Sequence, residues 1–294
     1  DQVADKRFGH GLGVGDVNGD GRLDILAKDG WFEQPQQRDG DPKWPFHAFQ
    51  FTLAGGADMH AYDVDGDGDN DIITSLTAHD FGLAWFEQFR EAGQIQFRQH
   101  LIMGSKPEEN RYGLVFSELH SIALADMDGD GLKDIVTGKT YWSHHTQSPM
   151  WDAGAVVYWF KLVRSKDGVD WVPFKADGEA GIGRQLIVGD MNKDGLPDLV
   201  MGGMKGAHVL LHRRQSVDET TWRLSQPQPP KLLRAGLPPQ EAAAHMTVPP
   251  GFRVKLAAGE PQVHQPVAMA IDHRGRVWVA EAYTYPIRAP EGQG

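Results

Sequence analysis

The sequence predicts an all-β protein built as a propeller of four-stranded blades. An acidic, glycine-containing loop occurs four times, a short aliphatic segment follows each copy, and alternating segments lie between the copies. The composition agrees with this fold class, because 35 Gly, 18 Pro and 10% aromatic residues suit a turn-rich β protein. At 294 residues the chain is long enough to bury a sizeable core.

Each loop is a nine-residue segment with Asp or Asn at positions 1, 3, 5 and 9. Loops one to four span residues 16–24, 63–71, 126–134 and 190–198, and their first aspartates lie roughly 47, 63 and 64 residues apart. Carboxylate oxygens at this spacing converge on one point, and Gly at position 6 lets the carbonyl of position 7 join them. We therefore predict up to four structural Ca²⁺ ions. The predicted ligands are Asp16, Asn18, Asp20, Asp24, Asp63, Asp65, Asp67, Asp71, Asp126, Asp128, Asp130, Asp134, Asp190, Asn192, Asp194 and Asp198.

The residues after each loop distinguish it from an EF-hand. An EF-hand closes its site with a bidentate Glu at position 12 and continues into a helix. Position 12 here is Ala27, Thr74, Thr137 or Met201. The aliphatic residues that follow position 9 instead predict a short buried strand. A polar hairpin turn is the alternative interpretation of any single copy, and the fourfold acid spacing favours calcium.

Residues 8–213 resemble FG-GAP/VCBS repeats, the calcium-loop propeller blades also found in integrin α-subunits. The resemblance implies that each loop joins the first two strands of a blade and binds one Ca²⁺. Asn18 and Asn192 at position 3 each remove one charge, which should weaken loops one and four. Loop four departs further, with Lys193 at position 4 and Pro197 at position 8. Four blades are fewer than is usual for this family, so we expect them to be part of a larger ring.

Short alternating segments predict the remaining strands of each blade. First strands are predicted at 10–15, 120–125 and 185–189, and third strands at 30–34, 82–88, 155–161 and 207–212. Outer strands are predicted at 46–51, 97–102 and 171–175. The aromatic residues of the third strands, including Trp85 and Phe86, are expected to pack between blades, and a sugar-stacking surface is the alternative.

The chain changes character near residue 213. We divide it into blades at 1–214, a Pro-rich linker at 215–248 and the start of a second β domain at 249–294. One or two helical turns are predicted at 241–246, and a hairpin is predicted from 266–272 and 276–281. The segments 249–252, 265–272 and 278–283 resemble the N-terminal edge of a PVC-type, glucose/sorbosone-dehydrogenase-like domain. The resemblance covers too little of that family to include an active site.

Charge and composition limit the function classes. The net charge of −11 argues against nucleic acid as a partner. Without metal the clustered carboxylates repel one another, so folding is expected to be coupled to calcium. The absence of Cys excludes disulfides, and no run approaches the roughly 18 apolar residues of a membrane span. Because calcium is abundant outside the cytoplasm, we expect an extracellular or periplasmic location.

Three function hypotheses follow. The first is a non-catalytic, calcium-stabilised module of a secreted multidomain protein that binds a glycan or a protein. The alternative is the scaffold part of a sugar-oxidising dehydrogenase or a polysaccharide-degrading enzyme, motivated by the resemblance of the second domain. Integrin-like adhesion is a third hypothesis that depends on fold analogy alone. No catalytic set can be assigned from residue spacing.

Histidines form a further pattern. His10 and His120 each lie six residues before the first Asp of a loop, which indicates a shared structural role near the propeller axis. His79 and Asp80 belong to a polar insert of the kind that lines a propeller face. His144-His145 is interpreted as an exposed loop pair, with transition-metal binding as the alternative.

Overall fold

The structure is a computed structural model that describes residues 3, 9–143, 146–227, 239–259, 262–264 and 266–281. The chain divides into two compact units, residues 1–230 and 231–294.

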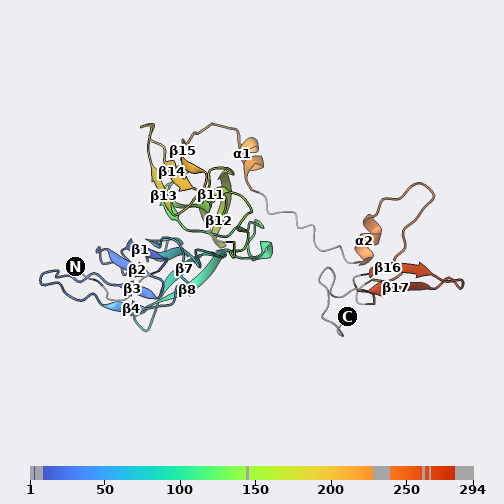
Figure 1. Ribbon diagram of the computed structural model, residues 1–294, viewed down its shortest axis with the longest axis horizontal. Helices are drawn as coiled ribbons and strands as arrows, with labels where there is room; N and C mark the ends of the chain where they lie inside the picture. Colours follow the sequence, from blue (N-terminus) through green and yellow to red (C-terminus); the bar gives the residue numbers. More distant parts are fainter. Residues whose placement is uncertain are drawn as a thin grey trace. The chain divides into compact units, whose positions relative to one another are not determined.

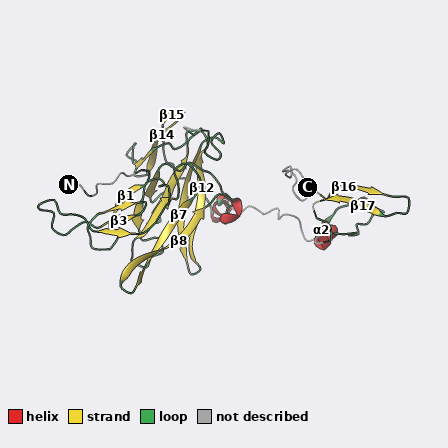
Figure 2. Ribbon diagram, turned by 60° about the horizontal axis from the view of Figure 1, so that its bottom comes forward, coloured by secondary structure: helices red, strands yellow, loops and turns green. Residues whose placement is uncertain are grey.

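The first unit is a four-blade β-propeller of antiparallel sheets (Figures 1 and 2). Blade one contains β1 (Leu12–Gly15), β2 (Asp24–Ala27), β3 (Gly30–Phe32) and β4 (Phe46–Ala48). Blade two contains β5 (His60–Tyr62), β6 (Asp71–Ser75), β7 (Leu83–Glu91) and β8 (Gln94–Met103). Blade three contains β9 (Ile122–Ala125), β10 (Asp134–Lys139), β11 (Val156–Ser165) and β12 (Gly168–Asp177). Blade four contains β13 (Gln185–Gly189), β14 (Asp198–Gly203) and β15 (Gly206–Leu210).

The predicted fold class is confirmed, and so is the order of strands within the blades. Strands are adjacent in the sheet in the order in which they occur in the chain, as in an up-and-down meander. Blade four has three strands among the described residues, and no outer strand was predicted for it. Membership of a larger ring stays a prediction.

The innermost strands of the four blades surround a common groove of about 660 Å³, lined by residues of β1, β5, β9 and β13. Neighbouring inner strands run parallel, with a bridge between Gly13 and Met59. A Cβ atom at Gly13 would overlap the carbonyl oxygen of Met59. Glycine is therefore what allows β1 to approach β5 so closely.

Three hydrophobic clusters lie between neighbouring blades and hold them together. The cluster between blades two and three includes Trp85 and Phe160, and the cluster between blades one and two includes Phe86. These aromatic side chains are 1–6% exposed, so the prediction that they pack between blades is confirmed. A third cluster joins blade three to blade four through Met127 and Met201.

Helix α1 (Glu219–Ser225) lies inside the segment predicted as a linker. No helix was predicted at these residues. Asp218 caps it by accepting a hydrogen bond from the Thr221 N–H at 2.7 Å. A 3₁₀ turn, η1 (Pro107–Glu109), follows β8.

The second unit contains α2 (Pro239–His245) and a hairpin of β16 (Pro266–Ile271) and β17 (Val277–Glu281). The predicted helical turns and hairpin are confirmed. No helix among the described residues is long and apolar enough to cross a membrane.

Candidate metal centres

All four acidic loops connect the first strand of a blade to the second, as the resemblance implied. The position-9 aspartate is the first residue of the second strand in every blade. Its carboxylate is almost inaccessible to solvent, with exposed fractions of 0–1% for Asp24, Asp71, Asp134 and Asp198. The exposed tip of each loop is thus anchored by one buried acid.

Each position-9 aspartate fastens its loop to the blade by two hydrogen bonds. In loop two, the Asp71 carboxylate accepts the N–H of Val64 at 2.8 Å and the N–H of Gln88, in β7, at 2.7 Å. The other three loops have the same pair of bonds, one from position 2 and one from the third strand or the second residue after it. One carboxylate therefore fixes both the loop and the adjoining strand.

The remaining acidic side chains turn back over their own loop. In loop three, the Asp126 carboxylate accepts N–H groups of Gly129 at 2.6 Å, Asp130 at 3.1 Å and Gly131 at 3.0 Å. Position 3 accepts from position 5, and position 5 accepts from position 7, in all four loops. These bonds direct the carboxylates inward, as a hard-cation loop requires.

The carboxylates of positions 1, 3 and 9 converge in loops two and three. One oxygen atom from each residue lies within 4.8 Å of the others, and the two triads are Asp63, Asp65, Asp71 and Asp126, Asp128, Asp134. Loops one and four each have one carboxylate fewer, because Asn occupies position 3.

Electrostatics agree with a missing positive charge in loops one to three, whereas hydrogen bonds from the N–H groups of His212 and Met191 lower the pKa of Asp198 in loop four. Burial raises the pKa of Asp71 and of Asp134 to about 7. Burial also raises the pKa of Asp24. Desolvated carboxylates near other acids are a donor set that fits Ca²⁺, because a cation would stabilise their ionised form.

Cationic side chains already contact some of the loops. The Lys161 ammonium group bonds to the carboxylates of Asp128 and Asp130 in loop three. In loop two, the Arg164 guanidinium donates to the backbone carbonyl of Val64 at 2.8 Å and pairs with the Asp63 carboxylate at 3.7 Å. Loops two and three are therefore each partly neutralised by a cationic side chain of blade three.

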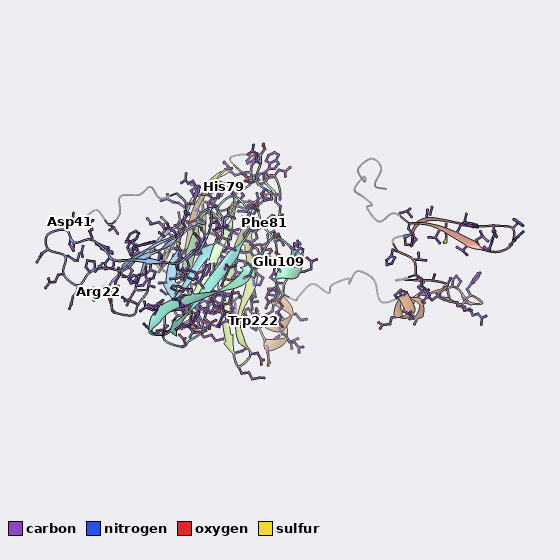
Figure 3. All side chains as sticks on the ribbon, turned by 90° about the horizontal axis from the view of Figure 1, so that it is seen from below. Arg22, Asp41, His79, Phe81, Glu109 and Trp222 are labelled. Atoms are coloured by element: carbon purple, nitrogen blue, oxygen red, sulfur yellow. The ribbon has the colours of Figure 1, made fainter. Side chains whose placement is uncertain are left out.

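A second cluster, made of histidine side chains, lies at the end of the blades opposite the acidic loops. His10 and His120 precede β1 and β9, and His79 lies in the connection from β6 to β7. In an antiparallel blade these positions are at the end away from the β1–β2 type of loop. Figure 3 labels His79 well away from Arg22 of loop one.

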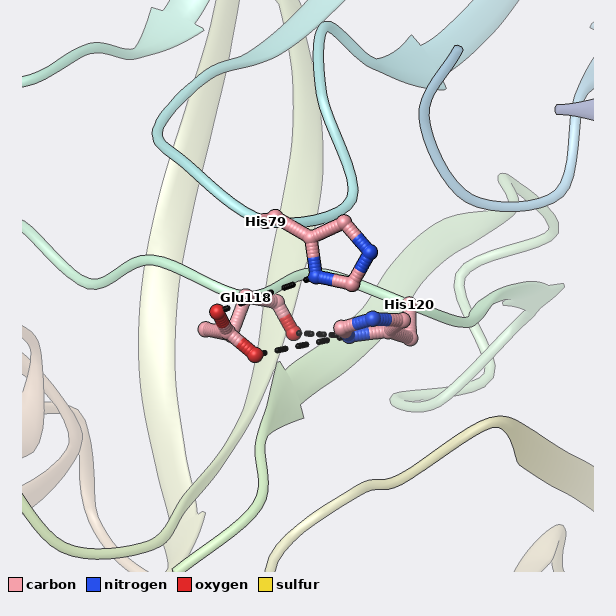
Figure 4. Close-up of side chains that lie close together, drawn as sticks. All are labelled: His79, Glu118 and His120. Carbon is pink, nitrogen blue, oxygen red and sulfur yellow. Dashed lines mark hydrogen bonds and ion pairs between the residues drawn. The ribbon is translucent and has the colours of Figure 1, made fainter. Parts of the chain in front are cut away.

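The histidine rings lie against one another. Ring centroids are 5.0 Å apart for His10 and His79, 5.7 Å for His10 and His120, and 4.8 Å for His79 and His120. The grouping of His10 with His120 was predicted. Glu118, whose carboxylate approaches both His79 and His120 (Figure 4), was not predicted as a member of this cluster. His144-His145 lies outside the described residues.

Comparison with known proteins adds one match. Residues 238–293 match a family described as Domain of unknown function (DUF7133). This match covers the second unit and not the propeller. A search of curated proteins finds no match.

Proposed function

We propose that the first unit is a calcium-stabilised propeller module of a secreted multidomain protein. The four acidic loops hold up to four structural Ca²⁺ ions, and the module binds a glycan or protein partner without catalysis. The observation that carries this proposal is the repetition of one hydrogen-bond framework in four loops, around carboxylates that fit a hard cation. Ca²⁺ would supply positive charge at the loops, and an extracellular or periplasmic location would provide it.

A polar cleft between blades two and three supports a glycan as the partner. Its volume is about 730 Å³, within the range of small-molecule sites. On one wall the His100 ring stacks on Trp85 with 4.4 Å between centroids and approaches the Glu87 carboxylate at 2.6 Å. Such a wall combines an aromatic body with polar atoms that can bond to sugar hydroxyl groups.

The other wall of the cleft comes from the segment after β8 and from β12. The Asp170 carboxylate accepts a bond from Arg111 at 3.0 Å and from the Tyr112 hydroxyl at 2.8 Å. Asp65 of loop two also lines the cleft. Calcium at loop two would therefore order one edge of the proposed glycan site, which couples the two parts of the proposal.

A glycan array probed with the calcium-loaded chain tests this function. We expect binding that is lost in EGTA and weakened at least tenfold by Asp170→Ala, because Arg111 and Tyr112 lose their shared partner. Glu179→Ala is the matched control, since this acid pairs with Lys205 on blade four. Binding that resists both EGTA and Asp170→Ala would contradict the proposal.

The sugar-oxidising alternative depends on the resemblance of the second unit. The matched family has no assigned function, so it adds nothing to that hypothesis.

A further inference from the structure

We propose that His79, Glu118 and His120 form a binding site for a transition metal of the zinc class. The site is separate from the acidic loops and lies at the opposite end of the blades. Its three ligands come from two blades and meet at one point, since one potential ligand atom from each lies within 4.8 Å of the others (Figure 4).

Glu118 is the main evidence for the site. Its side chain is 0% exposed, yet neither carboxylate oxygen has a hydrogen-bond partner among the described residues. A buried carboxylate without hydrogen bonds is costly, whether it is ionised or protonated, because either form leaves polar atoms unsatisfied. A metal ion coordinated by the carboxylate would remove that cost.

The nearest nitrogen atoms are placed for shared coordination. His79 Nδ1 lies 4.0 Å from one Glu118 carboxylate oxygen, and His120 Nδ1 lies 3.9 Å from the other. These two separations are too long for hydrogen bonds. His120 Nδ1 also lies 3.1 Å from the backbone carbonyl oxygen of Glu118, to which it donates a hydrogen bond. Two ligands of one tetrahedral zinc ion lie about 3.4 Å apart, as follows from bond lengths of about 2.0–2.1 Å. Small side-chain rotations, with loss of the contact between His120 Nδ1 and the Glu118 carbonyl, would bring all three groups onto one ion.

His10 orients His79. The Nε2 atoms of the two rings are 3.2 Å apart, within hydrogen-bond distance. When His79 carries its proton on Nε2, that atom donates to His10 and Nδ1 faces Glu118 with its lone pair. Metal-bound histidines commonly donate their second ring nitrogen in this way. His10 is thus a positioning residue.

The backbone at Glu118 is held in an unfavourable conformation. Its φ angle of 66° lies in the left-handed region, which non-glycine residues rarely adopt. The Glu118 N–H is fixed by the carbonyl of Asp80, next to His79, at 3.0 Å. Strain of this kind gathers at functional sites, where the surrounding structure imposes it.

Lys139 is the alternative partner for the Glu118 charge. Its ammonium group is buried, and the burial lowers its pKa although Glu118 and Asp152 oppose this effect. The Lys139 ammonium group donates its hydrogen bonds to the carbonyl oxygens of Thr140 at 3.2 Å and Trp151 at 3.5 Å. Lys139 balances charge at a distance but does not satisfy the carboxylate oxygens.

A cavity of about 450 Å³ lies beside the site, and His120 is the proposed ligand that lines it, together with His10 and Arg184. Arg184 occupies in blade four the position that His10 and His120 occupy in their blades, six residues before the first Asp of the loop. Three protein ligands beside a cavity leave a coordination position for an exogenous oxygen ligand. Two imidazoles and one carboxylate favour Zn²⁺ over Ca²⁺, which prefers oxygen ligands only.

Titration of the full chain with Zn²⁺ in calcium-saturated buffer tests the site, because the acidic loops are then filled. We expect one Zn²⁺ per chain, with binding weakened at least tenfold by Glu118→Gln and by His120→Gln. His47→Gln is the matched control, since His47 pairs with Glu33 on the surface of blade one. Calcium titrations should be the same in all four proteins.

Absorption of the Co²⁺-substituted wild-type chain gives a readout that does not depend on the variants folding. Four- or five-coordinate Co²⁺ absorbs far more strongly in the visible range than the hexaaqua ion, and we expect the stronger spectrum. Failure of the calcium-saturated wild type to bind Zn²⁺ would overturn the proposal. So would Zn²⁺ affinity that is unchanged in folded Glu118→Gln and His120→Gln.

Discussion

Replacing Asp71 by Ala tests whether the position-9 acids fasten the loops to the blades. The Asp71 carboxylate is buried and accepts the N–H groups of Val64 and Gln88. Alanine leaves both buried N–H groups without an acceptor, at a cost of about 1–3 kcal/mol each. The free energy of unfolding should therefore fall by about 2–6 kcal/mol. For a unit of this size each kcal/mol lowers the melting temperature by about 2–4 °C.

The assay is thermal unfolding followed by circular dichroism in EGTA and again in calcium. In EGTA we expect a fall in melting temperature on the order of 5–20 °C, and in calcium a larger fall, because the variant also loses a ligand. Asp69→Ala, at position 7 of the same loop, is the control, since it keeps the backbone groups and should change stability by less than about 1 kcal/mol. Equal melting of the two variants in EGTA would refute the reasoning.

Three further changes test other parts of the structure. Gly13→Val should destabilise the propeller by about 1–3 kcal/mol in thermal unfolding, because the Cβ atom of valine would overlap the Met59 carbonyl. An unchanged melting temperature would contradict the close approach of β1 and β5. Lys161→Met should strengthen calcium binding at loop three by on the order of tenfold in calorimetry, because the substitution removes a positive charge that competes with calcium. Weaker calcium binding in this variant would contradict the idea that Lys161 competes with the ion. Burial lowers the pKa of His60. As the pH drops from about 7 to 5, the unfolded chain therefore takes up a proton near pH 6.5 before the folded chain does, and the free energy of unfolding should fall. His60→Gln should make the free energy of unfolding depend less steeply on pH, and an unchanged pH dependence would exclude His60 as its source.

The propeller could be predicted because its determinants are local. Spacing of acids and glycines within nine residues defines each loop, and the aliphatic residues after position 9 define the strand that follows. Asp134 shows the connection, since the residue that closes loop three also begins β10 and becomes its buried anchor. The hairpin of β16 and β17 could also be predicted, because both segments alternate in hydrophobicity and a turn lies between them at 272–276.

Helix α1 was missed because composition outweighed a local signal. The Pro-rich stretch that follows suggested an extended linker, although Asp218 three residues before Thr221 is a typical N-cap arrangement.

The histidine–glutamate cluster was only partly predictable, because tertiary structure creates it. His10, His79 and Glu118 come from three separate segments, which the parallel approach of the inner strands brings together. The equivalent positions of His10 and His120 were visible in the sequence. No spacing rule connects them to Glu118, whose significance depends on its burial and its φ angle.

Calorimetric titration of the purified chain with Ca²⁺, beside a melting curve in EGTA, tests the calcium-stabilised propeller most directly. We predict up to four sites, one per loop, and a large fall in melting temperature when calcium is chelated. Absence of binding together with an unchanged melting temperature would contradict the account and reduce the four loops to acidic turns.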